Sequence, residues 1–186
     1  MSLIPADVFQ NLANYCRNYI INAYNPTSSL AEPSGLRTSL MTKHKGLYVG
    51  IFSPKDEEIC SEGILKEDLT DILDTGNLVC RKIFDALRAK NITESVFKTC
   101  QCNFALVKDI IYIMDSLDWN QAIDGIYMQW GQKYKGIYLP YQIKRMKVTK
   151  NVVMDRLCSW QCGIVSSCWK MPEGLTYKVV CDSLSL

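Results

Sequence analysis

The sequence predicts an α+β fold in which mixed or antiparallel sheets pack against helices. Apolar residues recur at helical spacing in three segments, and short apolar runs rich in β-branched and aromatic residues lie between them. Several of these runs are close enough to form hairpins, whereas parallel strands need long crossovers. With 186 residues, of which 48% are hydrophobic, the chain can bury the core of one domain spanning residues 1–186.

Helical periodicity predicts three helices. The first spans residues 5–23 and is ended by Asn25-Pro26. The second spans residues 69–87, and we expect Gly76-Asn77 to split or bend it because both residue types are weak helix formers. The third spans residues 152–160. Three of its side chains are predicted to share one face: Val153, Leu157 and Trp160.

Seven apolar runs predict strands, at residues 46–52, 59–65, 97–107, 109–114, 123–130, 136–139 and 175–180. A turn at residues 131–134 makes a hairpin of two of them, and Pro140 ends the second. Between residues 97–107 and 109–114 only Lys108 and Asp109 are available to turn. Residues 27–38, rich in Ser, Pro and Gly, are expected to form a mobile loop. Four side chains are expected to pack the hairpin onto the core: Ile126, Trp130, Tyr138 and Leu139.

Cysteine use and the first residues indicate the compartment. The nine cysteines are odd in number and irregularly spaced, unlike a secreted disulfide framework. Residues 1–10 lack the basic and apolar regions of a secretory leader, and no apolar run is long enough for a membrane span. We therefore expect a cytoplasmic or nuclear protein with reduced thiols and no membrane association.

Motifs for cofactors and nucleophiles are weak. Cys158, Cys162, Cys168 and Cys181 offer four thiolates, but they lack the two tight pairs of a zinc ribbon, so buried core positions are favoured. His44, the single histidine, lies between two lysines in an expected loop, which favours a solvated surface position over a catalytic base. No glycine-rich phosphate loop is present. We expect no metal and no cofactor.

A basic segment is the main charge feature, although the formal net charge is only +2. Residues 125–154 contain no acid, and Tyr134, Tyr138 and Tyr141 are interleaved with the cations. Exposed tyrosines beside cations would suit RNA, through phosphate contacts and base stacking. A solvated hairpin face with half-buried tyrosines is favoured over it. The candidate basic surface consists of Lys133, Lys135, Lys144, Arg145, Lys147 and Lys150.

Several short motifs resemble, in order and spacing, the AMME-syndrome candidate gene family (the AMMECR-one domain). The resemblance rests on Leu117-Asp118-Trp119, Ile123-Asp124-Gly125-Ile126, the Gly-Ile-Tyr-Leu-Pro segment at 136–140, the 154–163 helix with Leu-Cys and Gly, Trp169 and Tyr177. It implies an intracellular α+β domain with a larger and a smaller lobe. Prokaryotic relatives are associated with Memo-like and radical-SAM partners, which implies an accessory or substrate-modifying role.

The chain departs from this family at its most characteristic motif, Leu-Arg-Gly-Cys-Ile-Gly. At that place the sequence lacks the arginine and the Gly-Cys order. The Asp-x-Arg-Phe-Pro stretch of the family is matched only by the dissimilar residues 85–88. The candidate family-motif region here is Ile59, Cys60, Ser61, Glu62 and Gly63.

Three functions remain open. A non-catalytic interaction or accessory domain with a protein partner is favoured, because the motif is eroded and cofactor signatures are missing. The first alternative is a divergent enzyme with a pocket near Cys60 and Glu62. However, Cys60 lies among Glu57, Glu58 and Glu62, whose charges should disfavour its thiolate. The second alternative is an RNA-binding module that uses the basic 125–154 region.

Overall fold

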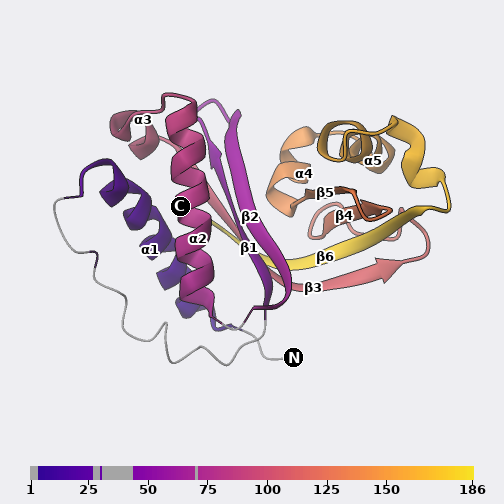
Figure 1. Ribbon diagram of the computed structural model, residues 1–186, viewed down its shortest axis with the longest axis horizontal. Helices are drawn as coiled ribbons and strands as arrows, with labels where there is room; N and C mark the ends of the chain where they lie inside the picture. Colours follow the sequence, from indigo (N-terminus) through magenta and orange to yellow (C-terminus); the bar gives the residue numbers. More distant parts are fainter. Residues whose placement is uncertain (1–3, 27–29, 31–43, 70) are drawn as a thin grey trace. The chain divides into compact units, whose positions relative to one another are not determined.

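The computed structural model describes residues 4–26, 30, 44–69 and 71–186 (Figure 1). The chain forms two compact units: the larger comprises Met1–Val107 with Asp182–Leu186, and the smaller is Lys108–Cys181. Both units combine helices with antiparallel strands, so the predicted α+β class is confirmed. Of the expected loop at residues 27–38, all but Leu30 lies outside the described residues.

Six strands make up the sheet, in the hydrogen-bonded order β2-β1-β3-β6-β4-β5. Strand β1 pairs antiparallel with β2 and β3, and β4 pairs antiparallel with β5 and β6. All the pairings just named are antiparallel, and the short connections β1–β2 and β4–β5 are the hairpins among them. The strands are β1 His44–Phe52, β2 Glu58–Leu69, β3 Gln101–Ile113, β4 Gly125–Trp130, β5 Tyr134–Tyr138 and β6 Gly174–Ser185.

In the larger unit, helices α1 (Ala6–Tyr24) and α2 (Ile72–Ala89) lie on one side of β1 and β2 (Figure 1). Helix α1 ends at Asn25, as Pro26 predicted. Helix α2 begins where the Asp71 side chain accepts hydrogen bonds from the backbone N–H groups of Leu73 and Asp74, both at 2.9 Å.

Helix α2 is not split at Gly76-Asn77, because it continues through both residues. A Cβ atom at Gly76 would lie 3.2 Å from Leu12 Cδ1 and 3.3 Å from Cys16 Sγ of α1. The glycine therefore lets the two helices pack closely. That packing offsets the weak helix propensity of glycine, which is about 1 kcal/mol below that of alanine.

Two expectations about the third strand are wrong. Phe97 lies not in a strand but in the short helix α3 (Glu94–Lys98), which begins where the Thr93 side chain accepts from the Val96 N–H at 3.4 Å. Strand β3 then runs unbroken from Gln101 to Ile113, with no turn at Lys108 and Asp109. The polar pair instead marks the place where β3 passes from the larger unit to the smaller one.

In the smaller unit, β4 and β5 form the predicted hairpin, and Gly131 in its turn has a φ of +58°. Ile126, Tyr138 and Leu139 are buried and Trp130 is half-buried against the same core, so the predicted packing is confirmed. The remaining elements are α4 Pro140–Met146, α5 Lys150–Arg156, the π-helical turn η1 Leu157–Gln161 and the 3₁₀ turn η2 Ser166–Lys170.

The predicted third helix changes its geometry before it ends. After α5, the Cys162 N–H donates to the Leu157 carbonyl, which closes the wider π turn of η1 at 2.9 Å. Val153 and Leu157 are buried, but Trp160 is 68% exposed. The expectation that these three side chains share a face is therefore wrong, because the π turn rotates the residues that follow Leu157 away from the α-helical register.

We predict that Trp130→Ala lowers the free energy of unfolding by about 2 kcal/mol. The loss is smaller than for a fully buried ring, because only part of the Trp130 side chain is buried. Urea unfolding followed by circular dichroism measures this. Lys135→Ala, an exposed position on the partner strand β5, is the matched control and should change stability little. Equal midpoints for the two variants would contradict the packing of Trp130.

Candidate functional site

The candidate family-motif region at residues 59–63 lies in strand β2, and the pairing with β1 shifts register at Ile59. Cys60 pairs with Ile51 of β1, and Glu62 pairs with Val49. Lys82 of α2 donates to the Gly63 carbonyl, and Lys90, which follows the last residue of α2, donates to the Ile59 carbonyl. A Cβ at Gly63 would lie only 2.0 Å from Tyr48 Cδ1, so this glycine makes room for the Tyr48 ring. These contacts give the segment a structural role in joining β2 to its neighbours.

Cys60 is 8% exposed, and its surroundings oppose a reactive thiolate. Burial raises the pKa of the Cys60 thiol to about 12; Lys90 lowers it, while Glu62 and Glu58 raise it further. The expected direction of the pKa shift is confirmed, although burial rather than the acidic neighbours is its largest cause. A nucleophilic cysteine requires the opposite shift.

The single histidine is buried, contrary to the expected surface position. His44 is the first residue of β1, pairs with Leu69 of β2 and is 2% exposed. The flanking lysines suggested solvent, but the strand begins two residues before the predicted run. Alternation along the strand then turns His44 inward and Lys45 outward.

Most of the other cysteines also lie in the cores. Burial raises the pKa of Cys158 to about 12 and that of Cys162 to about 11, and it raises the pKa of Cys168 as well. Cys181 of β6 is half-buried. Within the described ranges, no three His, Cys, Asp or Glu side chains come together as metal ligands would. The expectation of no bound zinc stays a prediction.

The candidate basic surface is exposed at Lys133, Lys135, Lys144 and Lys147 and half-buried at Arg145 and Lys150. Its interleaved tyrosines do not form a stacking platform, because Tyr138 and Tyr141 are buried and Tyr134 is half-buried. The Lys133 ammonium lies 5.3 Å from the Tyr134 ring centroid. The favoured interpretation, a hairpin face with tyrosines packed into the sheet, agrees with the positions of Tyr134 and Tyr138 on β5. It does not hold for Tyr141, which lies in helix α4.

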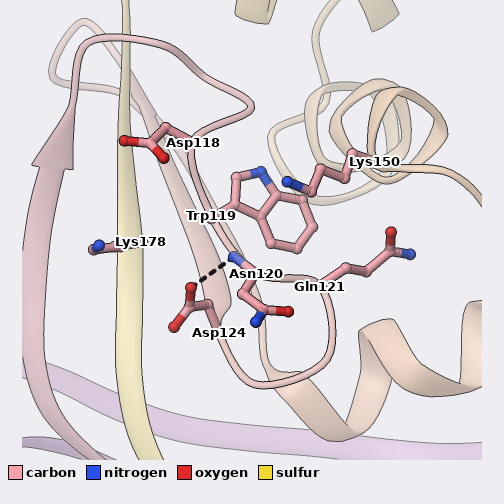
Figure 2. A pocket seen from close by; sticks show the side chains of 7 residues that line it. All are labelled: Asp118, Trp119, Asn120, Gln121, Asp124, Lys150 and Lys178. Atoms are coloured by element: carbon pink, nitrogen blue, oxygen red, sulfur yellow. Dashed lines mark hydrogen bonds between the residues drawn. The ribbon is translucent and has the colours of Figure 1, made fainter.

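A hollow of about 490 Å³ in the smaller unit gathers polar groups that the sequence did not single out together (Figure 2). Its lining comes from the β3–β4 loop, the start of α5 and strand β6: Asp118, Trp119, Asn120, Gln121, Asp124, Lys150 and Lys178. The loop holds its own shape, since the Asn120 N–H donates to Asp124 Oδ2 at 2.7 Å and the Ala122 N–H donates to Asn120 Oδ1 at 3.0 Å.

Trp119 is fixed in this hollow, with 4% of its surface exposed. Its Nε1 donates to the Ser116 carbonyl at 3.1 Å. The Lys150 ammonium donates to the Leu117 carbonyl at 2.9 Å and lies 5.5 Å from the indole centroid. Lys150 therefore ties α5 to the loop that carries the Leu-Asp-Trp motif.

Two charged groups in the hollow are left available. In the part of the chain that the structure describes, the Asp118 carboxylate and the Lys178 ammonium make no hydrogen bond or ion pair. Such a pair can orient a ligand of mixed charge. The lining has no hydroxyl, thiol or imidazole side chain, so it offers none of the usual nucleophiles of acyl transfer.

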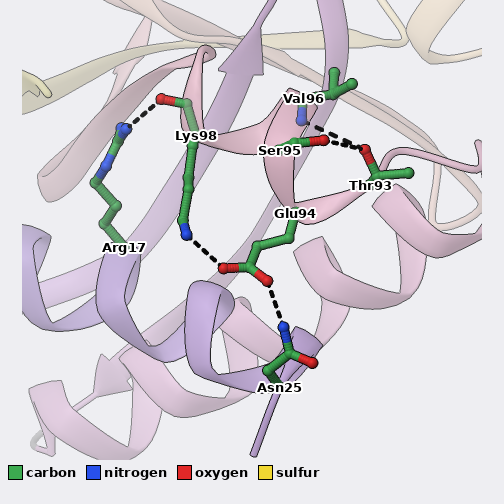
Figure 3. A network of polar contacts seen from close by, with 7 residues as sticks. All are labelled: Arg17, Asn25, Thr93, Glu94, Ser95, Val96 and Lys98. Carbon is green, nitrogen blue, oxygen red and sulfur yellow. Dashed lines mark hydrogen bonds and ion pairs between the residues drawn. The ribbon is translucent and has the colours of Figure 1, made fainter.

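A second hollow, of about 690 Å³, lies in the larger unit near the C-terminal ends of α1 and α2. Glu94 on its rim pairs with Lys98 at 2.5 Å and accepts from Asn25 Nδ2 at 2.6 Å (Figure 3). The hydrogen bond from Lys98 is the main cause that lowers the pKa of Glu94. Arg17 donates to the Lys98 carbonyl at 3.2 Å. This network joins α3 to α1, so its charges serve the fold.

Comparison with known proteins gives a fold and no activity. No family model and no curated protein matches the chain. The chain is similar to the crystal structure of an uncharacterized protein from Pyrococcus horikoshii, with a TM-score of 0.80 over 98% of this chain and 93% of that one. The two sequences are 14% identical, so the likeness establishes the shared fold alone. Among the described residues, no helix is long and apolar enough to span a bilayer.

We predict that the Cys60 thiol of the folded protein reacts slowly with iodoacetamide across neutral and mildly alkaline pH, because a pKa near 12 keeps it protonated. Mass spectrometry of the Cys60 peptide measures the rate, and urea-unfolded protein provides the comparison. An apparent thiol pKa well below the free value of about 8.5 would contradict this and would favour the enzyme alternative.

We predict that Lys150→Met destabilises the protein by about 1 kcal/mol, because it keeps the alkyl chain but removes the hydrogen bond to the Leu117 carbonyl. Thermal and urea unfolding measure the change. Lys144→Met, at an exposed position of α4, controls for loss of one positive charge. If both variants unfold at the same midpoint, Lys150 does not hold the loop.

Proposed function

We propose that this chain is a non-catalytic interaction or accessory domain that binds a protein partner. The observation that supports it most is the number of large apolar side chains that the smaller unit exposes. They are Ile111, Tyr112, Met114, Ile123, Val152, Trp160, Val165, Met171 and Leu175. In the larger unit, the described residues of this kind are only Leu78 and Val96. Single exposed apolar residues are ordinary, whereas neighbouring ones are typical of interaction surfaces, and Trp160, Val165 and Met171 lie on or beside η1 and η2, which contact each other.

The candidate nucleophiles argue against the enzyme alternative. Cys60 and His44 are buried in different strands, and burial raises the pKa of the Cys60 thiol. Glu62 lies on β2 beside Cys60, where α2 covers the strand. A binding role needs neither group to be ionised or reactive.

We further propose that the chain is a divergent member of the AMME-syndrome candidate gene family and works in the cytoplasm or nucleus. The family membership is supported by the Leu-Asp-Trp segment, whose Asp118 and Trp119 line the hollow. The location in the cytoplasm or nucleus is supported by the nine cysteines, all of which are free thiols. RNA is the less favoured partner, because Tyr138 and Tyr141 of the basic segment are buried and Tyr134 is half-buried.

A substitution of the apolar surface tests the interaction role. Met114, Ile123, Trp160 and Val165 are replaced together by Ser, and Leu78→Ser with Val96→Ser serves as the matched control on the larger unit. We predict that wild type and control co-purify with one partner at a stoichiometry of about one to one. The fourfold variant should recover at least about tenfold less of this partner. Quantitative mass spectrometry after affinity purification measures this.

Two outcomes would contradict the proposal. One is that no stoichiometric partner accompanies the wild-type protein. The other is equal recovery of the partner with the fourfold variant and with wild type. Circular dichroism of each variant shows whether its fold is kept.

A further inference from the structure

Trp160 differs from the other tryptophans of the chain. Trp119 and Trp169 are buried and Trp130 is half-buried, whereas Trp160 is 68% exposed. An indole in water forfeits a large amount of favourable apolar burial. Because tryptophan is the side chain most enriched among the residues that dominate binding energy, its exposure marks a candidate contact point.

The exposure of Trp160 is built into the backbone. An uninterrupted α-helix would put residues 153, 157 and 160 on one face, and the π turn of η1 breaks that register. Gly136 of β5 lets this turn pack closely: a Cβ there would lie 2.7 Å from Gln161 Cβ and 2.8 Å from Cys162 Sγ. The turn thus buries Cys158 and Cys162 and presents Trp160 to solvent. Such π turns are rare and often occur at functional sites.

Trp160 continues a surface stripe of helix α5. Val152 and Arg156 precede it at four-residue intervals, and the Arg156 guanidinium lies 4.8 Å from the Trp160 ring centroid. The 3₁₀ turn η2 contacts both α5 and η1, and its two flanking residues, Val165 and Met171, are exposed. We call this set the Trp160 surface: Val152, Arg156, Trp160, Val165, Lys170 and Met171.

The charge of the Trp160 surface selects its partner. Two acids lie next to the Trp160 surface in sequence. Asp155 Oδ1 already accepts from Trp169 Nε1 at 2.8 Å, and the exposed Glu173 lies two residues after Met171. Arg156 and Lys170 are the charged members of the surface. A second copy of this chain would bring the same cations face to face across a twofold axis, which is unfavourable. An acidic partner meets them with opposite charge.

We propose that the Trp160 surface binds an acidic amphipathic segment of a partner protein. Apolar side chains of the segment pack against Trp160 and Val165, and its carboxylates pair with Arg156 and Lys170. This inference rests on the proposed interaction role and names the surface and the chemistry of the partner. The exposed indole supplies apolar contact, and the cations set orientation and raise the association rate.

Three fluorescein-labelled synthetic peptides of equal length test the proposal. The first places Leu and Phe on one face of a helix and Asp and Glu on the other; the second replaces its acids by Lys; the third replaces its apolar residues by Ser. Fluorescence anisotropy with the full chain measures each dissociation constant. We expect the first peptide to bind at least about tenfold more tightly than the others, and less tightly as salt is raised.

Variants locate the binding. We expect Trp160→Ser to raise the dissociation constant of the first peptide by at least about tenfold. The double variant Arg156→Gln with Lys170→Gln should also bind this peptide less tightly, and its binding should depend less on salt. Leu78→Ser, which removes an exposed apolar side chain of the larger unit, should bind as wild type does. Melting temperatures confirm that Trp160→Ser remains folded.

Equal binding of all three peptides, no binding of the first, or unchanged binding by Trp160→Ser would overturn the proposal. So would a dimer, seen by light scattering, that Trp160→Ser dissolves, since a second copy would then occupy the surface. If the co-purified partner is lost from the fourfold variant but kept by Trp160→Ser, the interaction role holds and this surface is the wrong one.

Discussion

Continuous backbone pairing along β3 is the constraint on which both units depend. In the larger unit, residues 101–107 of β3 pair with β1, and beyond Lys108 the same strand supplies Ile113 to the core of the smaller unit. Buried N–H and C=O groups need partners, so a chain that enters the sheet at Gln101 continues as a strand while neighbours are available. Two charged residues do not interrupt it, because their side chains need not enter either core.

Local patterns predicted most elements of this fold. The apolar run in β1, the Asn25-Pro26 stop and the turn at Gly131 are each decided by residues adjacent in sequence. The errors have tertiary causes. Gly76 stays helical because α1 approaches it, and Trp160 leaves the buried face because η1 packs on Gly136. Neither neighbour is visible in a local window.

The candidate site shows the same limit. The family resemblance placed a candidate site at Cys60, but this segment is a strand with a register shift at Ile59, in which Gly63 accommodates Tyr48. The hollow around Trp119 needs Lys150 and Lys178, which lie about thirty and sixty residues further along the chain, so spacing could not have revealed it. The sequence shows which residues are apolar, but only the folded structure shows which of them are exposed.

The route of the chain between the two units has a consequence for the order of folding. The smaller unit is one continuous segment, whereas the larger unit is interrupted by it and is completed only when Cys102 and Leu186 exchange two backbone hydrogen bonds. Contacts that close long loops form late, because their entropic penalty precedes their reward. The edge of β3 at Cys102 therefore stays open to mispairing until the segment at Leu186, which follows the whole smaller unit in sequence, pairs with it.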